Sequence, residues 1–516
     1  MIRDVLVLGW DGAEPSLIAK LLAQGRLPNL ARLIATGRQG ILRSTIRPES
    51  SVAWTSFATG VNPGQHGIFG FMHSKPDFYH TRPVSSLDVR LPFFWEVLSQ
   101  RGYRVGILNM PMAYPPRPVN GWLVCGLMTP SSASMFTYPS ELGVQLLKRG
   151  YVIDADPIGL TGLDREAYVE YLISLVRMRT EIAHDLFSQG EYNLGIVVFT
   201  ELDRLQHLFW ADMDENHPLR PEHPLPGVID AHYEALDRSL GQLIQLASRD
   251  AEIIVMSDHG FGPFARQFYV NSWLIKEGFI RLKEEDKSII TDNLLLRLLK
   301  LIKKFDFAHS VKTHLFGKWS VIKAIEWNLF VDLIDWTRTR AWFSETGGIR
   351  INLKGREPAG IVYKTDKDRI IEDIIYGLKS IVVNGSSIFS TVNRSEELYS
   401  GSQLVFCPDI ILVPSCDPHN PSLNHRINSH NKYNLNQIFS SSFPYSGDHF
   451  IDGYFASNKN TEGLVNEIID LTRYIMNRFD TNSDLSSVPK AEQVQWTGRD
   501  DEEAVKRRLK ALGYLE

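Results

Sequence analysis

The chain of 516 residues is long enough to bury a large core and to hold more than one structural unit. Apolar residues make up 43% and aromatic residues 11%, which excludes a disordered chain. The 55 basic and 60 acidic residues give a formal net charge of −5, which argues against a protein that binds a nucleic-acid duplex through overall basicity.

Short apolar runs alternate with helical patterns along the chain. VLVLGW (5–10) predicts a buried strand, and PSLIAKLLAQG predicts a helix that Gly25 ends. Further strands are expected at 104–110, 194–200, 252–257 and 409–414. Helical stretches precede the first three of these strands: FFWEVLSQRG, DREAYVEYLISLVRMRTEIAHDLFSQG and IDAHYEALDRSLGQLIQLAS. This alternation predicts an α/β fold with a mainly parallel sheet.

Two adjacent serines stand at a predicted helix start. Ser50 and Ser51 precede VAWTSFATG, and the turn NPGQHGIFG brings His66 back toward the same edge. A hydroxyl at a helix N-terminus is first of all a cap. The same position also offers free backbone N–H groups to a phosphate, and a metal-bound serine hydroxyl becomes an alkoxide near neutral pH. Both interpretations stay open from the residues alone.

Four segments that lie far apart in the chain each end in residues of the types that bind metals. Three of the segments, VLVLGWDG, VVFTELDRLQH and VMSDHGFG, follow the strand pattern, and the fourth is GDHFIDG. Ligands of a parallel α/β sheet bind beyond the carboxyl ends of the strands, so these side chains are expected to converge. Three aspartates and three histidines suit a pair of divalent metals. The six residues are Asp11, Asp203, His207, Asp258, His259 and His449.

Each ligand taken alone has a plainer explanation. A single Asp after a strand is often only a helix N-cap. Asp203 and His207 are spaced i, i+4, so they share one helix face and can reach one metal or simply pair on a surface. Asp258 and His259 can both line a tight turn that the following glycines permit, although in a buried turn without a ligand both groups would be poorly satisfied. His449 is the least constrained, since a loop histidine is commonly a surface residue.

The region 270–345 has a different character. LLLRLLKLIKKF is strongly helical, and 293–325 is basic. We interpret 270–345 as a helical cap insertion over the ligand edge of the sheet, with a solvated amphipathic helix pair as the alternative. The predicted units are therefore a core formed by 1–269 and 346–455, the cap at 270–345, and a helical extension at 456–516.

In this order, the metal-ligand segments and the serine helix resemble the alkaline phosphatase superfamily, and more closely its type I phosphodiesterase/nucleotide pyrophosphatase branch. The resemblance runs from residue 1 to about 455, and the pattern xxAWTSFxTGxxPGxHGI is specific to it. NMPMAYPP, INLKGREPAGIV and RLKALGYLE also resemble prokaryotic members.

The resemblance implies a three-layer α/β sandwich with a mainly parallel central sheet and two metals, most often zinc. One metal would be held by Asp11, Ser50, Asp258 and His259, and the other by Asp203, His207 and His449. It also implies that Ser50 is the nucleophile.

The chain departs from its relatives close to the expected nucleophile. Nucleotide pyrophosphatases usually carry Thr as nucleophile and Asn three residues later, where this chain has Ser50 and Ala53. The side chain that helps them hold the phosphate is therefore missing, which weighs against nucleotide substrates. Sulfatases need a Pro and an Arg after the nucleophile, and Ser50 leads into Ser-Val-Ala-Trp instead.

The ligand set and the resemblance together predict a two-metal hydrolase that cleaves a phosphodiester or pyrophosphate bond through a phosphoserine intermediate. The expected cofactors are two divalent ions, zinc with manganese as a chemically compatible choice, and the expected partner is a small phosphorylated substrate. The alternatives are a phosphomonoesterase, a phosphonate hydrolase or a phosphotransferase like the cofactor-independent phosphoglycerate mutases. An alternative of another class is a metal-binding regulatory protein with an inactive site.

Location is predicted from the cysteines and the chain start. Three scattered cysteines without a CxxC pair are typical of a reducing compartment. The chain begins directly with a strand pattern, and no run reaches the 18 apolar residues of a membrane span. We therefore expect a cytoplasmic protein without a membrane span. The sequence specifies neither the leaving group, the pathway nor the oligomeric state.

Overall fold

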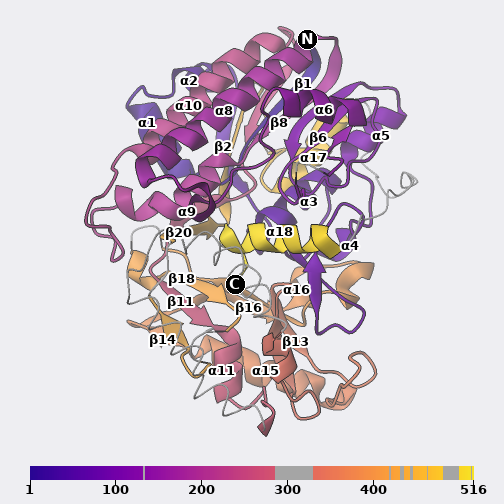
Figure 1. Ribbon diagram of the computed structural model, residues 1–516, viewed down its shortest axis with the longest axis vertical. Helices are drawn as coiled ribbons and strands as arrows, with labels where there is room; N and C mark the ends of the chain where they lie inside the picture. Colours follow the sequence, from indigo (N-terminus) through magenta and orange to yellow (C-terminus); the bar gives the residue numbers. More distant parts are fainter. Residues whose placement is uncertain are drawn as a thin grey trace.

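An eight-stranded sheet forms the centre of the larger of two lobes (Figure 1). The computed structural model describes residues 1–131, 134–284, 329–417, 420–430, 435–441, 445–461, 463–479, 499–512 and 514–515. The strands lie in the order β2 (Arg38–Arg43), β21 (Asp452–Ser457), β9 (Glu252–Met256), β1 (Ile2–Trp10), β8 (Tyr192–Phe199), β5 (Val105–Met110), β6 (Gly121–Cys125) and β7 (Thr137–Tyr138).

The middle of this sheet is parallel, as the sequence predicted. The pairs β9–β1, β1–β8, β8–β5 and β5–β6 are parallel, and antiparallel strands flank them at both edges. Every residue of β5 and β9 is buried, so these short apolar runs have neighbours on both faces. The predicted α/β class with a mainly parallel sheet is confirmed.

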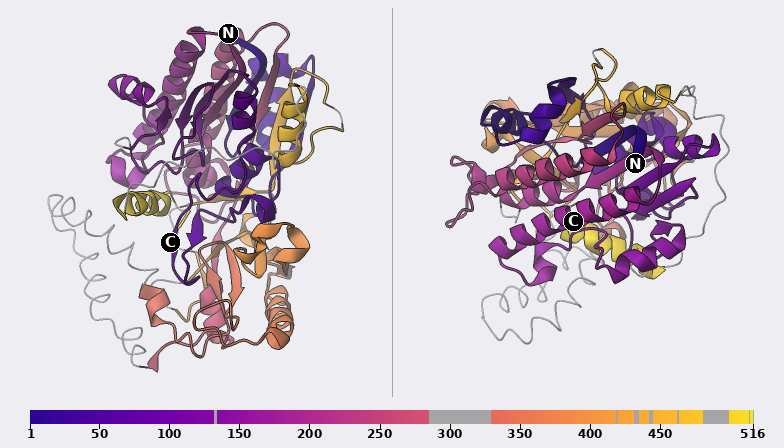
Figure 2. Two further views of the ribbon diagram at one scale, coloured as in Figure 1. Left: turned by 90° about the vertical axis from the view of Figure 1, so that its right-hand side faces the viewer. Right: turned by 90° about the horizontal axis from the view of Figure 1, so that it is seen from above.

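Helices cover both faces of the sheet and complete a three-layer arrangement. In Figure 2, left, the purple and magenta helices α8 and α10 lie on one side of the sheet and the yellow helix α17 lies on the other. The helices of this lobe are α1 (Pro15–Ala23), α2 (Pro28–Ile34), α3 (Ser50–Thr59), α4 (Pro63–His66), α5 (Phe94–Gln100), α6 (Ser140–Lys148), α7 (Ile158–Thr161), α8 (Arg165–Ser188), α9 (Glu201–Met213), α10 (Val228–Leu243) and α17 (Ile468–Asn477).

The smaller lobe has its own sheet and its own hydrophobic core. Its antiparallel sheet has the order β12 (Ala341–Ser344), β13 (Gly348–Ile351), β17 (Ile410–Pro414) and β16 (Phe389–Arg394). Its helices are α11 (Val270–Lys276), α15 (Lys364–Lys379) and α16 (Ser395–Leu398). The strand predicted at 409–414 therefore exists, but it belongs to this sheet and not to the parallel one.

Short strands and one helix lie where the lobes meet. The small sheets there are β10 (Gly260–Pro263) with β20 (Gly447–Phe450), β11 (Arg266–Tyr269) with β18 (His425–Asn428) and β19 (Phe439–Ser440), and β3 (Met72–Ser74) with β4 (Thr81–Pro83). The hairpin of β14 (Val382–Val383) and β15 (Ser386–Ser387) belongs to the smaller lobe. Helix α18 (Arg499–Ala511) lies between the lobes (Figure 1).

The predicted cap insertion falls largely outside the described residues. The basic stretch 293–325 lies entirely within 285–328, which the structure does not describe. The described ends of 270–345 contribute α11 and β12 to the smaller lobe. The core of that lobe draws on residues on both sides of 345. The predicted unit boundaries stay a prediction. Within the described ranges, no helix has both the length and the apolar character that crossing a membrane requires.

A buried carboxylate ties the smaller lobe together. Asp409 accepts from the Ile351 backbone N–H at 2.8 Å and from both Arg356 terminal nitrogens at 2.9 and 2.7 Å, and Lys367 Nζ lies 2.9 Å away. Burial alone would raise the pKa of Asp409, but the Arg356 hydrogen bonds and the cations outweigh it and hold this pKa far below its usual range.

Asp409→Asn is expected to destabilise the fold by roughly 2–3 kcal/mol at pH 7. The cost lies below the 3–5 kcal/mol typical of a broken, fully buried pair because Arg356 and Lys367 keep partial solvent contact. Because the folded-state pKa of Asp409 is depressed, its stabilisation is present above the unfolded pKa of about 3.9 and is lost as the pH falls below it. Urea unfolding at several pH values should therefore show the difference between wild type and variant narrowing below about pH 4. A constant difference would contradict this account.

Candidate active site

Three aspartates meet at the carboxyl ends of neighbouring strands. Asp11 follows β1, Asp258 follows β9, and Asp203 lies in the first turn of α9 directly after β8. These strands are adjacent and parallel, so their ends share one edge of the sheet. Gly12, at a φ of +73°, turns the chain so that its N–H donates to Asp258 Oδ1 at 3.3 Å. All three carboxylates are fully buried.

His259 and Ser50 join Asp11 and Asp258, and these four residues form the first half of the site. His259 Nε2 lies 3.1 Å from Ser50 Oγ, 3.2 Å from Asp258 Oδ2 and 3.6 Å from Asp11 Oδ1. The indole N–H of Trp54 donates to Asp11 Oδ2 at 2.9 Å, which leaves Oδ1 toward His259. The four residues that the resemblance assigned to one metal are therefore together around one imidazole nitrogen.

Asp203, His207 and His449 form the second half of the site, and strand pairing brings His449 to the other two. Strand β20 pairs antiparallel with β10, and His449 stands opposite Phe261. His449 Nε2 lies 3.0 Å from Asp203 Oδ1 and 3.0 Å from His207 Nε2, and His207 Nε2 is 3.5 Å from the same Asp203 oxygen. Their ligand atoms lie within 4.8 Å of one another. Asp203, Asp11 and His259 form a second such group, so Asp203 stands beside both halves.

The second nitrogen of each histidine is fixed by a backbone carbonyl. Nδ1 of His207 donates to Gly447 O at 2.9 Å, Nδ1 of His259 to Gly260 O at 3.0 Å, and Nδ1 of His449 to Pro48 O at 2.9 Å. A carbonyl oxygen only accepts, so each Nδ1 carries the proton and each Nε2 faces the carboxylates. This is the arrangement that orients histidines as metal ligands.

Two buried carboxylate oxygens support the same conclusion. Asp11 Oδ1 and Asp258 Oδ2 have no hydrogen-bond partner within the described part of the chain, and both face His259 Nε2. Burial raises the pKa of Asp258 to about 7, and burial together with the Asp258 and Asp203 charges raises the pKa of Asp11 well above its usual range. Such groups are satisfied by a cation, and oxygen and imidazole donors fit Zn²⁺ or Mn²⁺.

The electrostatics of the second half differ because a guanidinium lies beside it. Burial alone would raise the pKa of Asp203, but the His207 and His449 interactions and the Arg204 charge outweigh burial and hold this pKa well below its usual value. Arg204 Nη1 donates to Asp203 Oδ2 at 2.5 Å. Asp203 therefore stays ionised and is available as a ligand at neutral pH.

The two serines at the start of α3 have different surroundings. Ser50 Oγ donates to His259 Nε2, and Glu49, not Ser50, occupies the cap position of the helix. Ser51 Oγ is buried and has no hydrogen-bond partner among the described residues. The structure thus puts the Ser50 hydroxyl in the site. His66 bonds to Ser56 Oγ at 2.9 Å and accepts from the Ile68 N–H at 3.1 Å, so it stabilises the following turn.

Three contributing residues escaped the sequence reasoning. Trp54 lies within the predicted helix VAWTSFATG, and its indole N–H holds Asp11. Arg204 is the neighbour of a predicted ligand, and Tyr514 comes from the far end of the chain and donates to Asp203 Oδ2 at 2.5 Å. The RLKALGYLE resemblance was the one signal that pointed to Tyr514.

A pocket opens beside His449, between the two lobes. It is lined by charged, aromatic and aliphatic side chains, and its walls come from both lobes. The lining residues are Arg47, Pro48, Glu49, Phe343, Gly347, Leu412, Val413, Pro414, Arg426, Ile427, Asn428, Asp448, His449 and Tyr514. A ligand in this pocket would lie next to the ligands of the second half.

Comparison with known proteins gives one family and a shared fold. Residues 5–419 match the type I phosphodiesterase/nucleotide pyrophosphatase family. No curated protein matches. Phosphonoacetate hydrolase from Sinorhizobium meliloti 1021, with phosphonoacetate, is 16% identical with a TM-score of 0.55, over 92% of this chain and 95% of that chain. Human ectonucleotide pyrophosphatase/phosphodiesterase 5 is 13% identical over 93% and 95%, with a TM-score of 0.48. At such identity the hydrolase likeness concerns the fold alone.

Proposed function

Since the chain belongs to the type I phosphodiesterase/nucleotide pyrophosphatase family of metal-dependent phosphoric ester hydrolases, we propose that it cleaves a phosphodiester or pyrophosphate bond with Ser50 as the nucleophile. One observation carries this proposal: the Ser50 hydroxyl donates to an imidazole nitrogen that also faces two buried carboxylates. A hydroxyl in such surroundings is suited to attack phosphorus.

Two groups of residues would hold the metals. Asp11, Ser50, Asp258 and His259 would hold one divalent ion, and Asp203, His207 and His449 the other, with Zn²⁺ or Mn²⁺ matching the donors. When bound, the two ions would lower the pKa of the serine hydroxyl and neutralise the charge on the phosphoryl oxygens.

The chain's own groups then define a two-step displacement. Ser50 Oγ gives up its proton to solvent and attacks phosphorus, the Ser50 O–P bond forms, and the P–O bond to the leaving group breaks, so that an alcohol or a phosphate leaves after taking up a proton. A water molecule then attacks the phosphoserine, the Ser50 O–P bond breaks, a phosphate ester leaves with the water oxygen, and a water proton restores the serine hydroxyl. The backbone N–H groups at the start of the ten-residue helix α3 favour the negative phosphoryl group throughout.

The pocket next to His449 suits a substrate with an additional arm. Its lining joins Arg47 and Arg426 with aliphatic residues, so it fits an ester arm that carries both polar and apolar parts. The S. meliloti hydrolase was solved with phosphonoacetate and with phosphonoformate, which are small phosphorus-containing anions, and this supports a substrate of modest size. We place the reaction in the cytoplasm, following the cysteine usage of the sequence.

A matched pair of aryl esters tests the bond type. Metal-loaded protein is expected to turn over bis-p-nitrophenyl phosphate with a kcat/KM at least about tenfold above that for p-nitrophenyl phosphate, equivalent to about 1.4 kcal/mol. The reverse preference would identify a phosphomonoesterase. A protein that binds two metals and turns over neither ester, nor any of a panel of pyrophosphates and phosphonates, would be a metal-binding regulatory protein instead.

A further inference from the structure

The segment around α18 reaches the metal-ligand cluster from outside the catalytic sheet. After α18, the Tyr514 N–H donates to Leu509 O at 2.8 Å, and the Tyr514 ring stacks on Phe71 with centroids 4.6 Å apart. Tyr445 fastens the end of the helix by donating to Ala511 O at 2.9 Å. These contacts hold the Tyr514 ring 5.7 Å from the His207 ring, between centroids.

The two oxygens of Asp203 have separate partners. Oδ1 faces the Nε2 atoms of His207 and His449. Oδ2 accepts from the Tyr514 hydroxyl and from Arg204 Nη1, each at 2.5 Å. The tyrosine hydroxyl keeps its proton at neutral pH, because its ordinary pKa is about 10. The carboxylate is therefore held by one oxygen while the other points to the histidines.

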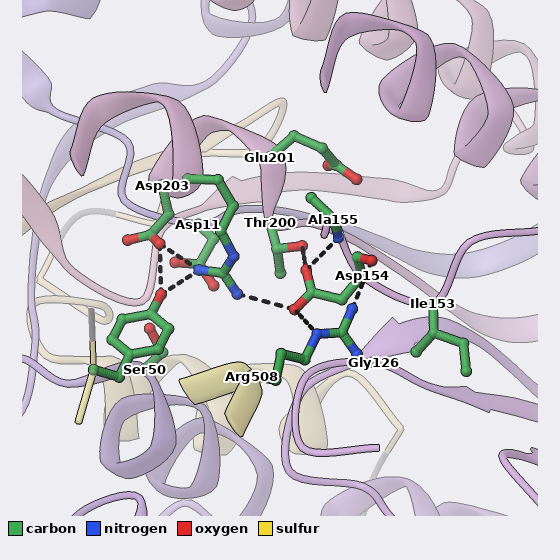
Figure 3. A network of polar contacts seen from close by, with 12 residues as sticks. Asp11, Ser50, Gly126, Ile153, Asp154, Ala155, Thr200, Glu201, Asp203 and Arg508 are labelled. Atoms are coloured by element: carbon green, nitrogen blue, oxygen red, sulfur yellow. Dashed lines mark hydrogen bonds and ion pairs between the residues drawn. The ribbon is translucent and has the colours of Figure 1, made fainter. Parts of the chain in front are cut away.

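A second chain of polar contacts connects helix α18 itself to the Asp203 carboxylate. Arg508 of α18 donates to Asp154 O at 2.6 Å, and its Nε lies 3.5 Å from Asp154 Oδ2. Asp154 Oδ2 in turn accepts from Arg204 Nη2 at 3.2 Å, and Thr200 Oγ1 donates to Asp154 Oδ1 at 3.1 Å. Figure 3 shows this network extending from Arg508 through Asp154 toward Asp203.

We propose that Tyr514 is a positioning residue for the second half of the site: its hydroxyl fixes Asp203 Oδ2, so that Oδ1 is presented to a divalent cation shared with His207 and His449. The α18 segment thereby becomes part of the catalytic architecture, directly through Tyr514 and indirectly through Arg508. Partners that orient a ligand from behind typically change metal affinity or activity 10–100-fold. This inference rests on the proposed two-metal function for its ligand set.

Tyr514→Phe is the direct test, because it removes the hydroxyl and keeps the ring that stacks on Phe71. Zn²⁺ binding to metal-stripped protein is measured by competition with a chelating dye, and the ion content is counted after dialysis. We expect the site of His207 and His449 to lose about 10–100-fold in affinity and the site of Asp258 and His259, which Asp203 borders, to lose less. Arg508→Met should weaken the first of these sites less, since it acts through two intermediate residues.

Lys506→Met is the matched control on the same helix. Lys506 Nζ donates to Thr81 O at 3.0 Å, away from the ligands, so its loss should leave both zinc affinities at the wild-type values. The proposal is overturned if Tyr514→Phe binds both ions as tightly as wild type, or if Lys506→Met lowers the same affinity equally, which would mean that the helix only supports the fold.

The outcome separates this inference from the proposed reaction. Wild-type protein that binds two ions but cleaves no phosphorus ester would refute the reaction, while a selective affinity loss in Tyr514→Phe would still support the positioning role. Wild-type protein that binds no zinc or manganese would refute both.

Discussion

Ser50→Ala is expected to lower kcat for the preferred phosphodiester by at least about 10³-fold, because the variant lacks the oxygen that attacks phosphorus in the first step of the proposed mechanism. The Ser50 hydroxyl bonds to His259, so its removal leaves the backbone of α3 and the other ligands in place. Rapid-quench labelling with a substrate that carries ³²P should detect a phosphoenzyme in wild type and none in the variant. Circular dichroism and thermal melting should show an unchanged fold.

Ser51→Ala is the matched control. Ser51 is the neighbour of Ser50, has the same chemistry and is equally buried, but its hydroxyl has no hydrogen-bond partner among the described residues. The Thr55 hydroxyl donates to the Ser51 carbonyl oxygen, which an alanine retains. We expect kcat within about threefold of wild type, since the deleted hydroxyl is buried without a hydrogen-bond partner among the described residues and its removal leaves no other polar group unpaired. An inactive Ser51→Ala beside an active Ser50→Ala would reverse the assignment of the nucleophile.

Removing a ligand from either half of the site is expected to lower the metal content from about two ions per chain to about one and to reduce activity at least about 10²-fold. His449→Ala should empty the half formed with Asp203 and His207, and Asp258→Ala the half formed with Asp11 and His259. Metal analysis after dialysis against buffer with trace zinc measures the content.

Asp203→Asn distinguishes a divided site from a shared one. Asp203 lies near His207 and His449 and also near Asp11 and His259, so its replacement is expected to weaken both ions, unlike the other two changes. If His449→Ala still retains two ions, the proposed grouping of ligands is wrong. If all three variants lose both ions, the two halves bind metal as one cooperative unit.

The sequence predicted the part of the site that follows from local patterns. Asp11, Asp203 and Asp258 each follow a continuous apolar run, and parallel strands bring such ends together whatever their separation along the chain. The i, i+4 spacing of Asp203 and His207 also needed only a helix. The convergence of these residues was therefore predictable from the sequence alone.

Residues placed by long-range pairing were not predictable in the same way. His449 looked like an ordinary loop histidine, because the pairing of β20 with β10 that positions it has no local signal. The apolar run DIILVP (409–414) resembled a strand of the parallel sheet. A buried strand has the same continuous apolar sequence pattern in a parallel and in an antiparallel sheet. Tyr514 and Arg204 contact the Asp203 oxygen that faces away from the histidines. Residue spacing in the sequence does not show which residues contact each oxygen of a carboxylate.

The distribution of the ligands along the chain constrains when the centre can form. His449 lies 246 residues after Asp203. At the usual 5–20 residues per second of synthesis, Asp203 and His207 leave the ribosome about 12–50 s before His449. During that interval the nascent chain holds an incomplete set of the candidate metal ligands, and strand β10 lacks its partner β20. Under the proposed two-metal function, the complete ligand set would therefore form only late in biosynthesis, once residue 449 has joined residues that were synthesised much earlier.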